Sequence, residues 1–202
     1  MIDTVVFDLG GVLIDWDPRH LYRQLFADED EMELFLATVC TLEWHARFDE
    51  GRPIAEGIAE LVERHPELEP MIRAYAERWQ DMFAGEVPGT VDVLESLHDR
   101  GVPLFAITNW PGETFPAARE RFGFLARFDG IVVSGEEGVM KPDRRLFGVL
   151  VDRHGVDPAA SLFVDDTQRH LDTAAAMGFS VERFTDPASL RDRLVREQLL
   201  PE

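Results

Sequence analysis

Short apolar runs that end in polar or turn residues recur along the chain. The first covers residues 4–7 and runs directly into Asp8 and a pair of glycines. Four later runs have the same character and cover residues 102–108, 130–134, 161–164 and 179–182. A short apolar run bounded by turn residues is typical of a strand that is buried on both faces. The pattern therefore predicts about five buried strands.

Between these later runs, apolar residues recur at spacings of three and four. Such spacing predicts helices. One begins near Val91 and ends at Gly101, and the others cover 117–122, 146–151, 171–177 and 187–200. Strands that alternate with helices form a parallel sheet with right-handed crossovers. We therefore predict an α/β fold, a three-layer parallel sheet with the strand of residues 4–7 at its centre.

The segment from about residue 19 to residue 85 has a different pattern. Its apolar residues are spaced helically, as in Met32, Phe35, Leu36 and Val39, and no convincing strand appears. We predict a helical insert after the first strand. The corresponding division is a core domain of residues 1–14 and 89–202 and an inserted helical domain of residues 15–88.

The composition narrows the classes of partner. Of 202 residues, 39 are acidic and 20 are basic, which gives a net charge of -19. Nucleic acid and anionic membranes both require a positive face, so we expect neither as a partner. A small anionic substrate stays possible, because a few cations and a metal reverse the field inside a cleft. The single cysteine, Cys40, allows no internal disulfide. No apolar leader or membrane span is present, so we expect a soluble cytoplasmic protein. The oligomeric state is not indicated.

Polar residues stand at the ends of three predicted strands, and the carboxyl ends of parallel strands share one edge of a sheet. Lys141 follows the strand of residues 130–134 and enters the same region. Carboxylates suit Mg²⁺, whereas a hydroxyl, an amide and a lysine suit phosphate. The combination predicts phosphoryl transfer through an aspartyl-phosphate. The strand-end residues are Asp8, Thr108, Asn109, Asp165 and Asp166.

Four stretches, residues 7–13, 107–109, 140–143 and 163–166, resemble the four motifs of the haloacid dehalogenase-like (HAD) hydrolase superfamily, in the same order. The insert of residues 15–88 resembles that superfamily's small helical cap. The resemblance implies a Rossmann-like core and a Mg²⁺-dependent phosphatase. The implied substrate is a small phosphorylated metabolite, with sugar phosphates as one class.

The resemblance also assigns roles to residues of the metal site. Asp8 corresponds to the nucleophile and to a Mg²⁺ ligand, and the backbone carbonyl of Gly10 corresponds to a second ligand. Asp166 corresponds to the main acidic ligand of the fourth motif. Asp165 lies beside it, either on the metal or directly behind it.

The remaining matched residues concern phosphate. Thr108 and Asn109 correspond to phosphate-binding residues. Lys141 corresponds to the cation that steadies both the nucleophile and the phosphate. This assignment agrees with electrostatics, because a lysine and Mg²⁺ together offset charge that would otherwise repel an anionic phosphate from Asp8.

Gly10 departs from the usual phosphatase pattern. Phosphatases of this superfamily usually carry a second aspartate at that position, which acts as general acid and base and contributes about 10²–10⁴-fold. A sugar-phosphatase-like subgroup with a similar opening also has glycine there, so Gly10 does not by itself indicate inactivity. Asp15, Asp17, a residue of the insert and solvent are all candidates for the missing group.

Two other functions remain as alternatives. Hydrolytic 2-haloacid dehalogenation also uses an aspartyl ester, but it needs no metal, and the acidic pair Asp165–Asp166 argues against it. A catalytically silent binding module is suggested by Gly10 alone. The histidines show no metal-binding spacing, so we expect them to be solvated or at helix ends, with only His20 near the site. Trp16, Trp44 and Phe48 are candidates either for the substrate pocket or for packing inside the insert, and Trp110 is a candidate for the cleft.

Overall fold

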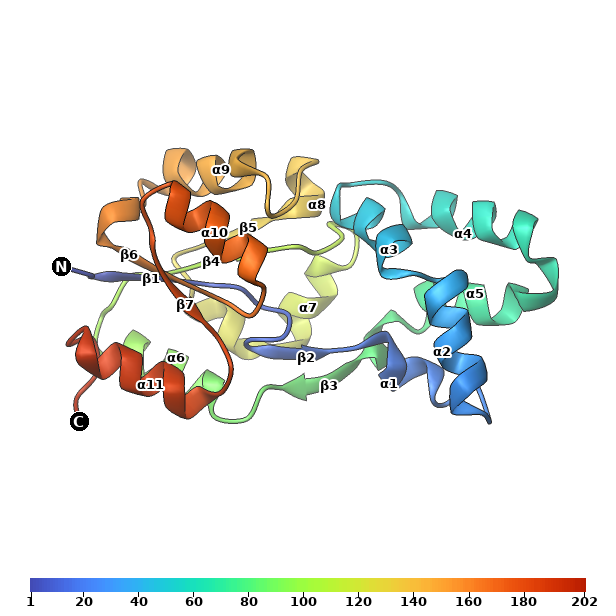
Figure 1. Cartoon of the computed structure of the whole chain (residues 1–202), viewed down its shortest axis with the longest axis horizontal. Coiled ribbons are helices and arrows are strands. Elements are labelled where there is room, and N and C mark those ends of the chain that lie inside the picture. Colours follow the sequence, from blue (N-terminus) through green and yellow to red (C-terminus); the bar gives the residue numbers. More distant parts are fainter.

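A five-stranded parallel sheet forms the centre of the larger lobe, with helices on both faces (Figure 1). The computed structural model describes all 202 residues. The strand order β5-β4-β1-β6-β7 places β1 in the middle, which confirms the predicted α/β fold. The strands are β1 (Thr4–Phe7), β4 (Leu104–Thr108), β5 (Gly130–Val133), β6 (Ser161–Asp165) and β7 (Ser180–Arg183).

The register of the central strands brings their carboxyl ends to one edge. Phe7 pairs with Ala106 on β4 and with Val164 on β6, all in parallel. The Asp8 N–H continues the ladder by donating to the Val164 carbonyl at 2.9 Å. The residues that follow β1, β4 and β6 therefore lie side by side at the edge where ligands bind in open α/β sheets.

The pleat of β1 sends alternate side chains to opposite helical layers. Val5 and Phe7 are fully buried with the layer of α6 (Thr90–Asp99), α7 (Phe115–Arg121) and α11 (Pro187–Arg196). Val6 is fully buried on the other face, in a cluster with α9 (Arg144–His154) and α10 (Gln168–Ala176). Both faces of the sheet are covered, which explains the uninterrupted apolar runs. A short helix, α8 (Ser134–Glu137), follows β5.

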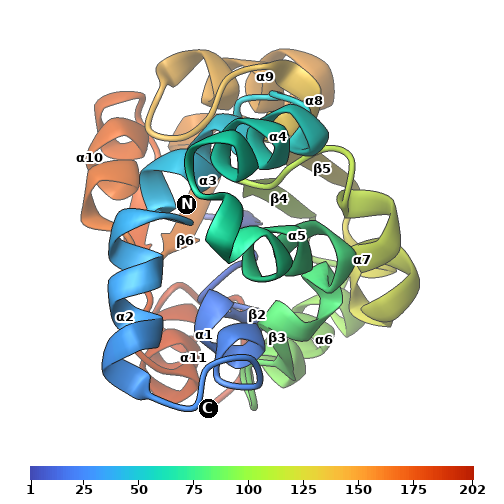
Figure 2. The same cartoon turned by 90° about the vertical axis from the view of Figure 1, so that its right-hand side faces the viewer.

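The second lobe is helical and lies beyond the carboxyl edge of the sheet (Figures 1 and 2). It contains α1 (Pro18–Tyr22), α2 (Glu29–Thr38), α3 (Leu42–Asp49), α4 (Ile54–Arg64) and α5 (Glu69–Glu77). Shorter 3₁₀ turns occur at Pro66–Leu68 and Trp79–Met82 here, and at Gly123–Arg127 and Pro158–Ala160 in the sheet lobe. We call residues 15–88 the cap segment, and its treatment as a domain separate from residues 1–14 and 89–202 stays a proposal.

Two short antiparallel strands join the lobes, β2 (Ile14–Trp16) and β3 (Phe83–Glu86). The expectation of no strand between residues 19 and 85 was therefore wrong at its end. The stretch Phe-Ala-Gly-Glu has no apolar run, and Gly85 has a φ of +136°. Its pairing depends on β2, about seventy residues earlier, so local periodicity gives no sign of it.

None of the helices combines the length and the apolar character that a membrane crossing requires.

The buried face of α9 provides a test of the packing. Leu146 is fully buried, so Leu146→Ala should lower the free energy of unfolding in urea by about 2–5 kcal/mol through lost burial and a residual cavity. Leu34→Ala is the matched control, because Leu34 on α2 is 63% exposed and its replacement should change that energy by less than about 0.5 kcal/mol. Equal effects of the two changes would contradict the packing described.

Candidate active site

Asp8 lies directly after β1 and is buried. Its Oδ1 accepts a hydrogen bond from the Leu9 N–H at 2.7 Å, and its Oδ2 lies 2.8 Å from Lys141 Nζ. Burial raises the pKa of Asp8 to about 8; Lys141 opposes this shift, while the nearby carboxylates Asp165 and Asp166 add to it. Ionisation of Asp8 therefore depends on positive charge close to it.

Lys141 supplies one such charge from the segment between β5 and α9. It is fully buried, and its Nζ lies 2.7 Å from Asp165 Oδ2 as well as 2.8 Å from Asp8 Oδ2. Burial favours the neutral amine, but the two carboxylates outweigh that effect and raise the pKa of Lys141. The lysine is therefore a permanent cation between two strand ends.

Asn109 holds the main chain of Lys141 in place. Asn109 Oδ1 accepts a hydrogen bond from the Lys141 N–H at 2.8 Å, and Asn109 Nδ2 donates to the Lys141 carbonyl at 3.1 Å. Thr108, the other predicted phosphate-binding residue, is fully buried, and its Oγ1 donates only a long bond of 3.5 Å to the Asn109 carbonyl. In this arrangement Asn109 lies at the cavity, whereas Thr108 lies behind the wall.

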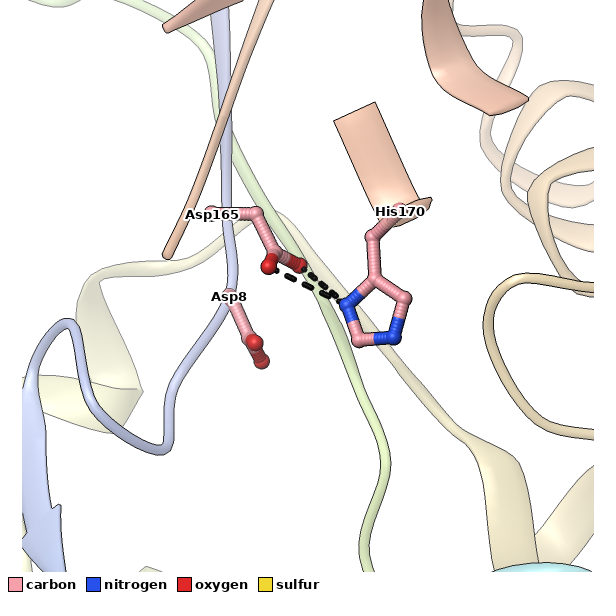
Figure 3. A group of neighbouring side chains, drawn as sticks. All are labelled: Asp8, Asp165 and His170. Atoms are coloured by element: carbon pink, nitrogen blue, oxygen red, sulfur yellow. Dashed lines mark hydrogen bonds and ion pairs between the residues drawn. The ribbon is translucent and has the colours of Figure 1, made fainter. Parts of the chain in front are cut away.

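Asp165 has no exposed surface and is held on several sides. Both of its oxygens contact His170 Nδ1 at 3.1 Å (Figure 3). Besides the contact of Oδ2 with Lys141, Oδ1 accepts from the Thr167 N–H at 2.8 Å. Burial favours the protonated acid, but Lys141 and His170 outweigh it and hold the pKa of Asp165 well below its ordinary value. Asp165 therefore orients Lys141 rather than facing the cavity.

His170 was expected to be solvated or at a helix end. It does lie at a helix end, but its contact with Asp165 was not predicted. It is buried in the first turn of α10, five residues after Asp165. The signal was its spacing, because the first turn of a helix that follows a strand brings such a residue back to the strand end. The burial of His170 beside a carboxylate depends on tertiary packing, which the spacing alone does not reveal.

Asp166, unlike Asp165, is exposed and faces the cavity beside the glycine turn. A Cβ atom added to Gly11 would lie 2.6 Å from Asp166 Oδ2, and Gly11 has a φ of +75°. Gly10 has no positive φ, and a Cβ atom there would meet nothing within 4 Å. The second glycine therefore allows the carboxylate to approach the backbone, while the first leaves open space.

The oxygen donors at this edge fit a hard divalent cation. Asp8 and Asp165 contact the single lysine, and Asp166 adds a third carboxylate near Asp8, so the sheet edge has more acidic groups than lysines. Asp8, Asp165 and His170 also place ligand atoms within 4.8 Å of one another. That group already contains Lys141 Nζ, which contacts both acids, so a metal ion has no room there. Asp8, Asp166 and the Gly10 main chain border the cavity instead and match the oxygen ligands that Mg²⁺ prefers.

A cavity of about 410 Å³ lies between the sheet edge and the cap segment. Trp16 and Trp110 line it, in agreement with the sequence-based expectation. Trp44 and Phe48 instead form the core of the cap segment, where Trp44 packs edge to face on Phe48 and Tyr75 at 4.6 and 4.7 Å between ring centroids. The walls also include Asp8, Gly10, Gly11, Leu42, His45, Ala46, Asp49, Trp79, Asn109, Pro111, Met140, Asp166, Thr167 and Arg169.

Asp15 and Asp17 do not border this cavity. Asp15 Oδ1 contacts His20 Nε2 at 3.0 Å, and Asp17 caps α1 by accepting from the Arg19 N–H at 2.9 Å. Both carboxylates are therefore engaged outside the cavity. His20, the one histidine expected near the site, lies outside it with them.

The glycine turn provides a matched pair of substitutions. Gly11→Ala should lower the free energy of unfolding by about 1–2 kcal/mol because of the left-handed backbone, and the contact with Asp166 adds to this cost. Gly10→Ala should be neutral or stabilising by up to about 1 kcal/mol, because it only restricts the unfolded chain. Chemical denaturation of both variants measures the difference, and a larger loss for Gly10→Ala would refute the turn geometry.

Two relatives span most of the chain. A protein named sesquiterpene phosphatase astK, from Aspergillus oryzae, is 26% identical and covers 91% of this chain and 90% of its own length. A phosphoglycolate phosphatase from Vibrio cholerae is 25% identical and covers 88% and 81% respectively. Both names describe phosphatases.

A solved structure shares the fold. It is a HAD family enzyme from Bacteroides thetaiotaomicron in complex with magnesium and inorganic phosphate. It is 20% identical, covers 94% of this chain and 99% of its own, and has a TM-score of 0.70. At this level of identity the likeness establishes the shared architecture.

The family assignment comes from the sequence profile of a known family. The profile described as haloacid dehalogenase-like hydrolase matches residues 2–178, which includes all four strand ends and loops described above. The chain belongs to the haloacid dehalogenase-like hydrolase family.

Proposed function

We propose that this hydrolase is a Mg²⁺-dependent phosphatase that acts on a small phosphorylated metabolite through an aspartyl-phosphate on Asp8. The observation that carries the proposal is the contact between Asp8 and the buried Lys141, at a cavity edge that also presents Asp166. The site thus joins a nucleophile, a fixed cation and a free carboxylate in one place. The names of both relatives and the magnesium and phosphate in the Bacteroides structure support the proposal.

In the proposed reaction, an Asp8 oxygen attacks the phosphorus of the substrate. A bond forms between Asp8 and phosphorus as the bond to the leaving oxygen breaks, and water then releases the phosphate. The contacts to Leu9 N–H and Lys141 fix the direction of the carboxylate. Mg²⁺, held by Asp8, Asp166 and the Gly10 carbonyl, would offset charge on the phosphate.

The proposed phosphate-binding groups are Lys141, Asn109 and Thr108. Lys141 offers a fixed positive charge next to Asp8. Asn109 Nδ2 has a second N–H besides the one that it donates to Lys141, and that N–H is free for a phosphate oxygen. Thr108 contributes only if its hydroxyl becomes accessible, because it lies behind the cavity wall.

The substrate class follows from size and charge. A cavity of about 410 Å³ is within the range of about 300–1,000 Å³ that small-molecule sites occupy. The two relatives are named for chemically different phosphoesters, so their names favour phosphate removal without fixing the alcohol. The net charge of -19 favours a small molecule over nucleic acid or an anionic membrane as partner.

The direct test measures phosphate release from a panel of sugar, carboxylic-acid and isoprenoid phosphates with and without Mg²⁺. We expect release that requires Mg²⁺, together with a phosphorylated Asp8 detected by peptide mass spectrometry. Asp8→Asn should reduce both signals to background, because an amide does not replace the nucleophilic carboxylate. Metal-independent halide release from 2-haloacids would instead establish dehalogenation. If no substrate of the panel releases phosphate and Asp8 is never phosphorylated, the protein is a binding module.

The metal assignment has its own test. Asp166→Asn should raise the Mg²⁺ concentration needed for half-maximal activity by 10-fold or more, on the order of the effect of losing a direct ligand. Asp172→Asn is the control, because Asp172 is an exposed α10 carboxylate bonded to Gln168. Calorimetric titration should likewise show weaker Mg²⁺ binding by Asp166→Asn than by Asp172→Asn. An unchanged Mg²⁺ affinity in Asp166→Asn would refute the assignment.

A further inference from the structure

The sheet edge lacks a group that can protonate the leaving oxygen. Gly10 has no side chain, and Asp15 and Asp17 are engaged outside the cavity. Lys141 contacts both Asp8 and Asp165 and is pinned between them. Among protein groups, a proton donor for the substrate is therefore to be found on the opposite wall, which the cap segment provides.

His45 is the histidine in that wall. It lies on α3, its side chain is 13% exposed, and it borders the same cavity as Asp8. The imidazole stacks against two neighbouring indoles, with ring centroids 4.8 Å from Trp16 and 5.8 Å from Trp79, and the two indole centroids lie 6.3 Å from each other. Its Nδ1 is hydrogen-bonded to the Tyr75 hydroxyl. The ring is therefore held in a defined orientation at the edge of the cavity.

Asp49 stands one helical turn after His45 and borders the cavity too. Its Oδ2 lies 3.3 Å from His45 Nε2, close enough for charge attraction, although the pair does not form a hydrogen bond. Asp49 is 5% exposed, and its Oδ1 is buried without any hydrogen-bond partner. A buried carboxylate oxygen without a hydrogen-bond partner is costly, and structural packing alone does not account for it.

We propose that His45, oriented by Asp49, is the general acid and base of this enzyme and replaces the side chain absent at Gly10. The inference rests on the proposed phosphatase reaction. As Asp8 bonds to phosphorus, the leaving oxygen takes the proton of the His45 imidazolium and departs as an alcohol. Water then attacks the aspartyl-phosphate and gives its proton to the neutral imidazole. The Asp8–phosphorus bond breaks, and both side chains return to their starting state.

If His45 is the general acid, the rate at which Asp8 is phosphorylated should depend on the leaving group in the His45 variants. Alkyl phosphates need protonation of the leaving oxygen, whereas p-nitrophenyl phosphate needs almost none. His45→Gln and His45→Phe should slow phosphorylation of Asp8 by alkyl phosphates about 10²–10⁴-fold and leave phosphorylation by p-nitrophenyl phosphate within a few fold. With p-nitrophenyl phosphate both variants should also release a burst of nitrophenolate, because the phosphorylated enzyme has lost its base.

Matched variants separate chemistry from packing. His65→Gln removes another cap-segment histidine that lies near a carboxylate, at 3.9 Å from Glu67, and outside the cavity, so its rates should equal those of the wild type. Asp49→Asn should slow phosphorylation by alkyl phosphates less than the His45 variants do, with the same dependence on the leaving group, as expected for a positioning residue. Added imidazole should partly restore the His45→Gln rate, and Gly10→Asp in that background should do so too, because the space at Gly10 is open.

The outcomes are distinct. His45→Phe keeps a flat ring against the two indoles, so it replaces His45→Gln in the test if thermal melts show that His45→Gln is unfolded. The proposal is overturned if both folded variants lose activity equally on alkyl and p-nitrophenyl phosphates, or match His65→Gln on both. A wild type that never phosphorylates Asp8 would overturn the phosphatase itself and this inference with it. If Asp8 is phosphorylated in the wild type but the His45 variants show no dependence on the leaving group, only the role of His45 is overturned.

Discussion

The site depends on one buried cation between two buried carboxylates. Lys141 Nζ lies within 2.8 Å of Asp8 and Asp165, and none of its surface is exposed. Loss of one partner from a buried ion pair costs about 3–5 kcal/mol, because the remaining charge is left without compensation. Three segments that are distant in the sequence must therefore meet at this point. Asn109 on a fourth segment fixes the lysine's main chain, so the central sheet edge and the charged site stabilise one another.

Much of this arrangement could be predicted because it follows from local pattern. An apolar run identifies a buried strand, a parallel sheet aligns strand ends, and polar residues at those ends must then converge. Asp8, Asp166 and Asn109 were identified in this way and lie at one cavity. Thr108 stays a predicted phosphate-binding residue. Its side chain is fully buried, and periodicity does not show which strand-end side chain turns into the core. The role of Asp165 was left open, and its bonds to Lys141 and His170 place it behind the cavity.

Which helical residues face the cavity was harder to predict, because core residues and site residues recur along a helix at the same spacing of three or four. Trp44, His45 and Phe48 lie within one turn of α3, yet only His45 reaches the cavity. The difference comes from the rotation of α3 against Tyr75 and Trp79. That rotation is set by contacts with segments about thirty residues away. The strand β3 escaped prediction for the same reason, since its partner β2 lies at the far end of the cap segment.

The two lobes contribute different groups to the cavity. The sheet edge holds the charged groups in fixed positions, because each is buried, paired or placed by a strand end. The cap segment contributes aromatic walls and an imidazole–carboxylate pair that borders the cavity, on helices that the sheet does not constrain. Proton transfer must follow the leaving group, whose position varies with the alcohol, whereas phosphate geometry is constant. A group that handles the alcohol oxygen is therefore better placed on the wall that also contacts the alcohol. In the proposed reaction, the open space at Gly10 would leave room beside Asp8 for that group to approach the leaving oxygen.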